Sequence, residues 1–348
     1  MPCADLVGTV DFFCEQLGFR LDNIWPADSP AQAIISTPGL HIELRLDPGP
    51  PPSSPGRIVV VSDSVYDRGI RSMSAPNEVV VEIIRSTPVV DVPPLQTSFV
   101  ISQLDEETSW VTGRAGMRYR DLVPDRQGGR FIASHIEIPG GGPVPDYVHF
   151  HDVRFQMIFC ARGWVKVVYE DQGEPFVLQA GDCVLQPPRI RHRVLEASPG
   201  LEVVEIGSPA EHLTTREHNI ELPTLTVRPE RDFGGQRFVR HVSADAPYGP
   251  WRAPGMACRD TGIGAATSGL ANVVVARPLD CEDGDVVGPV GHSGEYLQLF
   301  VLDGQATMHL DGRGVFPLRR ATSVLIPAGE QFSLSDLTED FEVLDISM

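Results

Sequence analysis

The feature that most constrains this chain is an internal repeat in its carboxyl-terminal two thirds. The segment at 160–170, CARGWVKVVYE, aligns with VLDGQATMHLD at 301–311 at an offset of 141 residues. The segment at 181–206 then aligns with 321–346 at an offset of 140, so one residue is lost in an intervening turn. Self-similarity of this kind is typical of two copies of one structural unit. The repeat therefore predicts two similar domains joined in tandem.

Short β-rich runs separated by turns make up most of the chain. Runs such as GWVKVVYE, LEVVEI and SVLIP are rich in β-branched residues, and 33 glycines and 31 prolines fall between such runs. Proline-rich stretches at 46–57 and 86–98 mark a long loop and then a domain boundary. We expect a mainly β protein with domains at 1–95, 96–215 and 216–348.

Three histidines of the first copy have a spacing that suits a metal site. His149 and His151 lie one residue apart on an expected strand, so their side chains project to the same side. In a β-barrel, a later antiparallel strand can return His192 beside them. Together with the oxygen of Gln156, these imidazoles form a donor set that can hold Fe, Mn, Ni, Cu or Zn. The competing interpretation is a barrel that binds nothing, and the spacing of the three histidines favours the metal.

This spacing resembles the two sequence motifs of the cupin family. The first motif contains HxH, a glutamate and a glycine, and the chain has His149, His151, Gln156 in place of the glutamate, and Gly163. The second motif is matched by Gly181, Pro187 and His192, with Arg189 for a glycine and Glu196 for an asparagine. The resemblance covers residues 110–348 and implies two cupin-type β-barrels (double-stranded β-helices), a bicupin.

Gln156 stands where the cupin family has a carboxylate. A neutral amide oxygen leaves a divalent ion with its full charge, which predicts weaker metal binding and a stronger Lewis acid. Such an ion would favour an anionic substrate, such as an enolate, a phenolate or a carboxylate. Equally open is a three-histidine site that suits Fe(II) and dioxygen, with Gln156 outside the coordination sphere.

The second copy lacks this donor set. The repeat offsets place Val290, His292, Leu297 and Phe332 at the positions of the four candidate ligands. Apolar residues at three of them predict a degenerate barrel that serves packing or dimerisation. We expect His292 and His309 to be structural or surface residues.

Residues 1–95 predict a small α+β domain. Its expected helix has Asp5 as N-cap, an apolar stripe, and Gly18 as a stop; the stripe comprises Leu6, Val10, Phe13 and Leu17. Strands are expected near 19–25, 31–37 and 40–47, with two more after the proline-rich loop. The segment resembles part of one module of the vicinal oxygen chelate (glyoxalase-like) family. One partial module does not close a metal site, so we interpret Glu82 as structural and the domain as a packing or dimerisation element.

Other polar residues near the motifs are weaker candidates. Arg191 and Arg193 neighbour an inward-facing histidine, so we expect them on a solvated face. His135 lies on a strand that leads into the first motif. Its side chain either lines the pocket or has a structural role. His135 and Glu196 are the candidate general bases.

The charge balance indicates the class of partner. The chain has 28 Lys and Arg against 47 Asp and Glu, a formal charge of −19, which disfavours nucleic acid and anionic membranes. We expect a small-molecule substrate. The sequence begins without a signal-peptide pattern and has no membrane-spanning run, which predicts a cytoplasmic protein. Six scattered cysteines predict free thiols, and exposed barrel edges favour a homodimer.

The leading functional hypothesis is a metal-dependent oxidoreductase, as the cupin resemblance implies. It is a non-heme dioxygenase, with Fe favoured over Mn, Ni, Cu or Zn, acting on a small enolisable or aromatic oxygenated substrate. One alternative keeps the metal as a Lewis acid in an isomerase, lyase or hydrolase. Another is a non-catalytic module that binds a small ligand.

Overall fold

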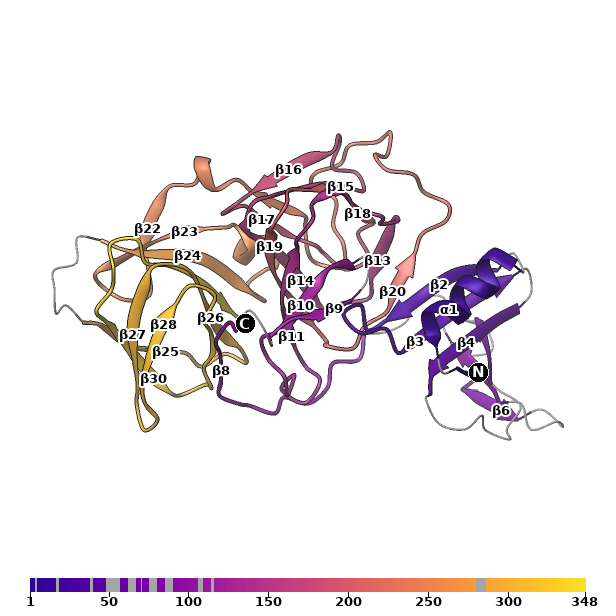
Figure 1. Cartoon of the computed structure of the whole chain (residues 1–348), viewed down its shortest axis with the longest axis horizontal. Helices are drawn as coiled ribbons and strands as arrows, with labels where there is room; N and C mark the ends of the chain where they lie inside the picture. Colours follow the sequence, from indigo (N-terminus) through magenta and orange to yellow (C-terminus); the bar gives the residue numbers. More distant parts are fainter. Residues whose placement is uncertain are drawn as a thin grey trace.

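A computed structural model shows an amino-terminal domain and two β-barrels (Figure 1). It describes all residues except 4, 17–18, 38–39, 48–56, 62–66, 70, 75–79, 85–89, 106–108, 114–115 and 280–285. The first barrel lies between the amino-terminal domain, drawn in indigo, and the second barrel, drawn in orange and yellow. The chain is mainly β, as the sequence predicts.

The amino-terminal domain is a small α+β unit. Its elements are β1 (Pro2–Cys3), α1 (Leu6–Asp11), the π-helix η1 (Phe12–Gln16), β2 (Arg20–Trp25), β3 (Gln32–Thr37), β4 (Leu40–Leu46), β5 (Arg57–Val61), β6 (Ser72–Ser74) and β7 (Val80–Ile84). The predicted strands are therefore present, and the structure adds a third strand after the proline-rich loop where two were expected. Its resemblance to the vicinal oxygen chelate family stays a prediction.

Helix α1 begins as the sequence predicts. Asp5 caps it, because its Oδ1 accepts a hydrogen bond of 2.9 Å from the backbone N–H of Gly8. Leu6 and Val10 are buried against the sheet in a cluster that includes Phe13. The predicted end of the helix at 17–18 lies outside the described residues.

The first barrel carries both motifs. Its strands are β9 (Val111–Thr112), β10 (Arg118–Asp121), β11 (Ile132–Ile138), β12 (Gly142–Pro143), β13 (His149–His151), β14 (Phe155–Arg162), β15 (Trp164–Tyr169), β16 (Phe176–Gln179), β17 (Cys183–Leu185), β18 (His192–Ala197), β19 (Leu201–Ser208), β20 (Thr214–Arg216) and β21 (Val239–His241). In one sheet the order is β17-β14-β19-β11, and in the other β16-β15-β18-β13.

The second barrel repeats this arrangement. Its elements are β8 (Val100–Ser102), the 3-10 helix η3 (Ser243–Asp245), β22 (Tyr248–Pro250), β23 (Met256–Asp260), α3 (Ile263–Ala266), β24 (Asn272–Pro278), β25 (Val287–Gly291), β26 (Leu297–Asp303), β27 (Gln305–Leu310), β28 (Gly314–Arg319), β29 (Ser323–Leu325), β30 (Gln331–Ser335) and β31 (Glu342–Ser347). The equivalent orders are β29-β26-β31-β24 and β28-β27-β30-β25. Eight strands therefore pair in the same order in both barrels.

The same local geometry explains the motif glycine of each copy. Gly163 and Gly304 end β14 and β26 with φ of 75° and 68°, a conformation that favours glycine. A Cβ on Gly304 would lie 2.6 Å from the Cα of Phe341, and one on Gly163 would lie 3.3 Å from the Cα of Leu201. Both glycines therefore permit a left-handed turn against a neighbouring strand.

The two barrels share one apolar interface. The outward faces of β11, β14 and β19 pack against those of β24, β26 and β31, with Phe131, Phe155, Tyr296 and Phe300 among the buried side chains. Each barrel also encloses a separate apolar cluster. The interface therefore fixes the outward faces of the strands and leaves their inward faces to line the barrel interiors.

Strand pairing crosses the predicted domain boundaries, which remain predictions. β8 pairs with β29 of the second barrel, and β20 pairs with both β13 and β2. One sheet therefore runs from the first barrel through β20 into the amino-terminal domain.

Among the described residues, no helix has the length and apolar character needed to cross a membrane. The five described cysteines are free thiols, and Cys281 lies outside the described residues. The predicted homodimer stays a prediction.

Candidate metal centre

The three motif histidines come together on two adjacent strands. His149 and His151 lie on β13, and His149 is directly opposite His192 on β18. One ring nitrogen of each lies within 4.8 Å of those of the other two. All three residues are buried, with exposed fractions of 3 to 6%. The predicted convergence of these side chains is therefore what the structure shows.

Hydrogen bonds orient the imidazole rings. The Nδ1 of His149 lies 2.8 Å from the carbonyl oxygen of Tyr147, and that of His192 lies 3.0 Å from the carbonyl oxygen of Ile190. A carbonyl oxygen only accepts, so each Nδ1 carries the proton and each neutral ring has its lone pair on Nε2. The Nδ1 of His151 lies 3.1 Å from Thr214 Oγ1. This arrangement is typical of metal-ligating histidines, so the residues fit a divalent transition metal.

Asp146 adds a carboxylate behind the first histidine. Its Oδ1 lies 3.6 Å from Nδ1 of His149, and its Oδ2 accepts a hydrogen bond of 2.9 Å from the backbone N–H of Val194. A carboxylate beside Nδ1 makes the opposite nitrogen a stronger ligand. Asp146 also ties β18 to the loop before β13, which steadies the distance between the ligand strands.

Gln156 lies in the same cavity and is bonded to a carboxylate. Its Nε2 donates a hydrogen bond of 2.6 Å to Oε1 of Glu205, on the adjacent strand β19. Because a carboxylate oxygen accepts, this contact fixes the orientation of the Gln156 amide and leaves its oxygen as the atom that can face an ion or a water. The carboxylate that the first motif lacks at residue 156 is therefore present in the cavity on another strand.

The cavity beside the histidines is small and mostly apolar. Its volume is about 130 Å³, and its lining includes Ile136, Ile158 and Val167 together with Gln156 and Glu205. A cavity of roughly 150 Å³ can hold a benzene ring. The space therefore suits a substrate with one ring or a smaller molecule.

Tyr169 closes one side of the cavity as a neutral phenol. Its ring stacks on that of His192, with centroids 5.6 Å apart. Burial raises the pKa of Tyr169 well above its ordinary value, and Gln186 Nε2 donates a hydrogen bond of 2.8 Å to its oxygen. Tyr169 therefore serves as a neutral wall at neutral pH.

Arg189 replaces a motif glycine but keeps the glycine conformation. Its φ is 62°, while its counterpart in the second copy, Gly329, has φ of 84°. The side chain forms an ion pair of 2.9 Å with Asp152, and the guanidinium lies 4.8 Å from the ring centroid of Phe150. These contacts offset the cost of a left-handed conformation in a residue with a Cβ.

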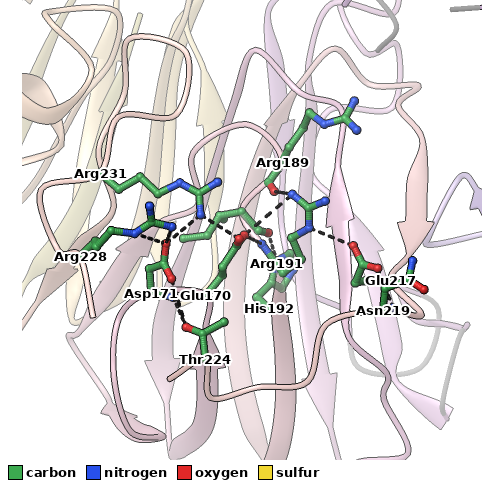
Figure 2. A network of polar contacts seen from close by, with 11 residues as sticks. Glu170, Asp171, Arg189, Arg191, His192, Glu217, Asn219, Thr224, Arg228 and Arg231 are labelled. Carbon is green, nitrogen blue, oxygen red and sulfur yellow. Dashed lines mark hydrogen bonds and ion pairs between the residues drawn. The ribbon is translucent and has the colours of Figure 1, made fainter. Parts of the chain in front are cut away.

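The outer face behind His192 carries an ion-pair network (Figure 2). Arg191 lies 3.2 Å from Glu217, and Glu170 and Asp171 both contact Arg231, at 2.7 and 2.8 Å. Arg191 therefore lies on the outer face, as expected, but its ion pairs leave the side chain only 21% exposed. Glu217, the residue directly after β20, is one of the partners of Arg191.

The two candidate general bases lie elsewhere. His135 is on the outward face of β11, where its Nε2 donates a hydrogen bond of 2.9 Å to Glu202 at the interface between the barrels. A bulge between Val194 and Ala197 turns Glu196 away from the interior, so Ala197 takes the buried position. Neither His135 nor Glu196 lines the cavity.

Three of the four equivalent positions of the second barrel are apolar. Val290 pairs with Phe332 as His149 pairs with His192. Leu297, at the position of Gln156, is fully buried. His292 donates from Nε2 to the carbonyl oxygen of Ile326, at 2.8 Å. This histidine therefore has a structural role.

Several cavity residues were not predicted from the sequence, among them Glu205 and His212. Glu205 occupies an inward position of LEVVEI, and its repeat counterpart, Asp345, is also acidic. An acidic residue at an inward position of both copies was a usable signal. His212 lies in the loop before β20 and also lines the cavity. No motif or periodicity marked that residue.

Comparisons with known proteins agree with this geometry. Residues 134–206 match the family model of the cupin domain. This part of the chain is therefore similar to a cupin domain. No curated protein sequence matches the chain.

Solved structures extend the likeness to most of the chain. An oxalate decarboxylase of Lactobacillus farciminis, in a formate complex, is 10% identical with a TM-score of 0.52, and the match covers 75% of this chain and 88% of that one. A salicylate 1,2-dioxygenase of Pseudaminobacter salicylatoxidans is 15% identical with a TM-score of 0.52, and the match covers 74% and 86%. At these identities the likeness shows a shared fold.

Proposed function

We propose that this protein is a metal-dependent bicupin, a non-heme dioxygenase that acts on a small enolisable or aromatic oxygenated substrate. His149, His151 and His192 hold the ion, with Fe favoured over Mn, Ni, Cu or Zn. The observation that carries the proposal is the buried triad, with its ligand atoms within 4.8 Å of one another and its rings oriented by Nδ1 hydrogen bonds.

The donor set supports oxygen chemistry. Three neutral imidazoles leave coordination positions open, and a divalent ion bound there would supply a Lewis acid and a site for substrate and dioxygen. The neutral amide of Gln156 leaves the charge of the ion undiminished, which favours a substrate with an anionic oxygen. Gln156 either ligates through its oxygen or orients a water, and Glu205 holds it in place.

The cavity supports the substrate class. Its volume of about 130 Å³ and its aliphatic walls suit one ring or a short enolisable chain, and its polar lining includes the histidines, Gln156 and Glu205. The apolar walls also exclude water from the reacting end.

Glu205 favours a second candidate, a Lewis-acid lyase, isomerase or decarboxylase. Such chemistry needs a group that moves a proton, and Glu205 lines the cavity that holds the histidines. The fold likeness to an oxalate decarboxylase is compatible with this class but does not argue for it.

Oxygen uptake tests the proposal. Fe(II)-loaded protein is screened with β-diketones, catechols, flavonoid-like phenols and hydroxybenzoates, beside the variant His149→Ala. We expect oxygen consumption with at least one ring compound in the wild type and none in the variant. Substrate turnover without oxygen consumption would select the second candidate. Failure to bind metal would leave a module that binds a small ligand.

A further inference from the structure

The amino-terminal domain closes the cavity beside the histidines. Pro26, Ala27 and Asp28, in the turn between β2 and β3, line this cavity. Strand β2 pairs with β20 at Thr214, and the side chain of Thr214 lies 3.1 Å from Nδ1 of His151. The strands that position a candidate ligand therefore also position the turn.

Asp28 presents a buried oxygen at this junction. Its Oδ2 forms an ion pair of 2.9 Å with Arg126, which also lies 3.1 Å from Asp121. Its Oδ1 is buried and has no hydrogen-bond partner among the described residues. Buried carboxylate oxygens are normally hydrogen-bonded, so a donor from a bound molecule would satisfy this one.

His212 supplies a second acceptor on the same cavity. Its Nδ1 lies 2.9 Å from the carbonyl oxygen of Pro209, so Nδ1 carries the proton and Nε2 carries the lone pair. Its ring centroid is 5.2 Å from that of His151. Among the described residues, the cluster of possible metal ligands comprises the three motif histidines without His212.

We propose that Asp28 and His212 form a substrate subsite at the domain junction. It accepts hydrogen bonds from a hydroxyl or amino substituent of a substrate that the ion holds at another atom. The inference therefore rests on the proposed function. The amino-terminal domain is then a specificity element, a role that the sequence analysis did not foresee.

Binding of matched ring compounds tests the subsite. Fe(II)-loaded protein is titrated calorimetrically under nitrogen with salicylates that carry a hydroxyl, an amino group or fluorine at ring position 4 or 5. Fluorine approaches a hydroxyl in size but cannot donate a hydrogen bond. We expect a donor-bearing probe to bind about tenfold more tightly than its fluoro counterpart at one of the two positions.

Two variants test whether Asp28 and His212 cause the preference for a hydrogen-bond donor. In Asp28→Asn, Arg126 should hold the amide oxygen, so the amide NH₂ replaces an acceptor in the cavity and the preference for a donor should vanish or reverse. His212→Phe keeps a ring but removes the acceptor, so the preference should fall. Asp11→Asn makes the same chemical change at an exposed position of α1 and should leave the preference unchanged.

The metal content of every sample separates the two proposals. Bound metal with no donor preference at either position, no binding of any probe, or a preference that survives Asp28→Asn would overturn the subsite alone. A wild type that binds no metal would overturn the proposed function, and the subsite with it. Tighter binding of either the hydroxyl or the amino probe, lost in Asp28→Asn, would support the subsite.

Discussion

The two barrels have the same strand order but different interiors. His149 faces His192 in the first barrel, and Val290 faces Phe332 at the same pair of positions in the second. Phe332 is fully buried in an apolar cluster. The barrel fold therefore does not require a histidine pair at these positions.

The acidic position shared by both barrels sharpens this difference. Glu205 pairs with Ile158 on β14, as Asp345 pairs with Leu299 on β26. In the second barrel Arg252 binds both oxygens of Asp345, each at 2.7 Å. In the first barrel Glu205 accepts a hydrogen bond from Gln156 beside the cavity. One position thus stabilises the fold in the second barrel and shapes the site in the first.

Replacing a candidate ligand of the first barrel by the residue at the equivalent position of the second barrel should have the largest effect. In His192→Phe, the residue of the second barrel replaces one candidate ligand, and we expect at least a 100-fold loss of metal affinity and of turnover. Metal titration and oxygen uptake measure the two losses. His292→Phe is the matched control, because His292 makes only a structural contact to Ile326. Equal losses in both variants would contradict the difference between the barrels.

Placing histidines at the equivalent positions of the second barrel should lower the stability of the protein without creating a metal site. Val290→His with Phe332→His places two imidazoles beside His292, in an interior filled by apolar side chains. We expect a loss of about 3 kcal/mol in the free energy of unfolding, because apolar packing is lost and polar groups are buried. Urea denaturation measures this loss. If this variant bound a second equivalent of metal, the identity of the ligand residues alone would distinguish the two barrels.

Replacing the shared acidic residue by its amide should affect mainly stability in the second barrel and mainly turnover in the first. Asp345→Asn breaks a buried ion pair with Arg252 and should lower the free energy of unfolding by about 3 kcal/mol, without changing turnover. Glu205→Gln should change stability by less than about 1 kcal/mol. It frees the orientation of the Gln156 amide, so turnover should fall about tenfold. Urea denaturation and steady-state rates of both variants check the contrast, and a reversal of the two outcomes would contradict it.

The smallest effect concerns the interface between the barrels. Burial alone would raise the pKa of Glu202, but hydrogen bonds from His135 and Arg320 outweigh burial and lower this pKa to about 2. The folded pKa lies below the ordinary value of 4.5, so this stabilisation is present above pH 4.5 and is lost as the pH falls toward 2.

Glu202→Gln should therefore remove a small part of the acid sensitivity of the protein. Thermal unfolding measured between pH 5 and pH 2 reports the difference between the variant and the wild type. Glu339→Gln, at an exposed position, is the control. Identical pH profiles for the wild type and Glu202→Gln would show that this ion pair does not link the barrels.

Local pattern was enough to predict the strands, the repeat and the triad. His149 and His151 alternate on one strand, and the spacing of the second motif returns His192 to it, so the sequence carries their convergence. The repeat also aligned Glu205 with Asp345. Their inward position could have been read from strand alternation, so Glu205 was a missed signal.

The junction with the amino-terminal domain could not be predicted in this way. Asp28 reaches the cavity because β2 pairs with β20, whose residues lie about 190 positions later in the chain. No local periodicity encodes that pairing. The partial burial of Arg191 has a similar cause, since its partner Glu217 lies 26 residues later in the chain, directly after β20.

The central claim is that the first barrel holds a metal and the second does not. Elemental mass spectrometry on protein purified without a metal-affinity tag tests it directly, with His149→Ala and His292→Ala prepared alongside. We expect close to one transition-metal ion per chain in the wild type and in His292→Ala, and none in His149→Ala. No metal in the wild type after reconstitution, or full retention in His149→Ala, would contradict it.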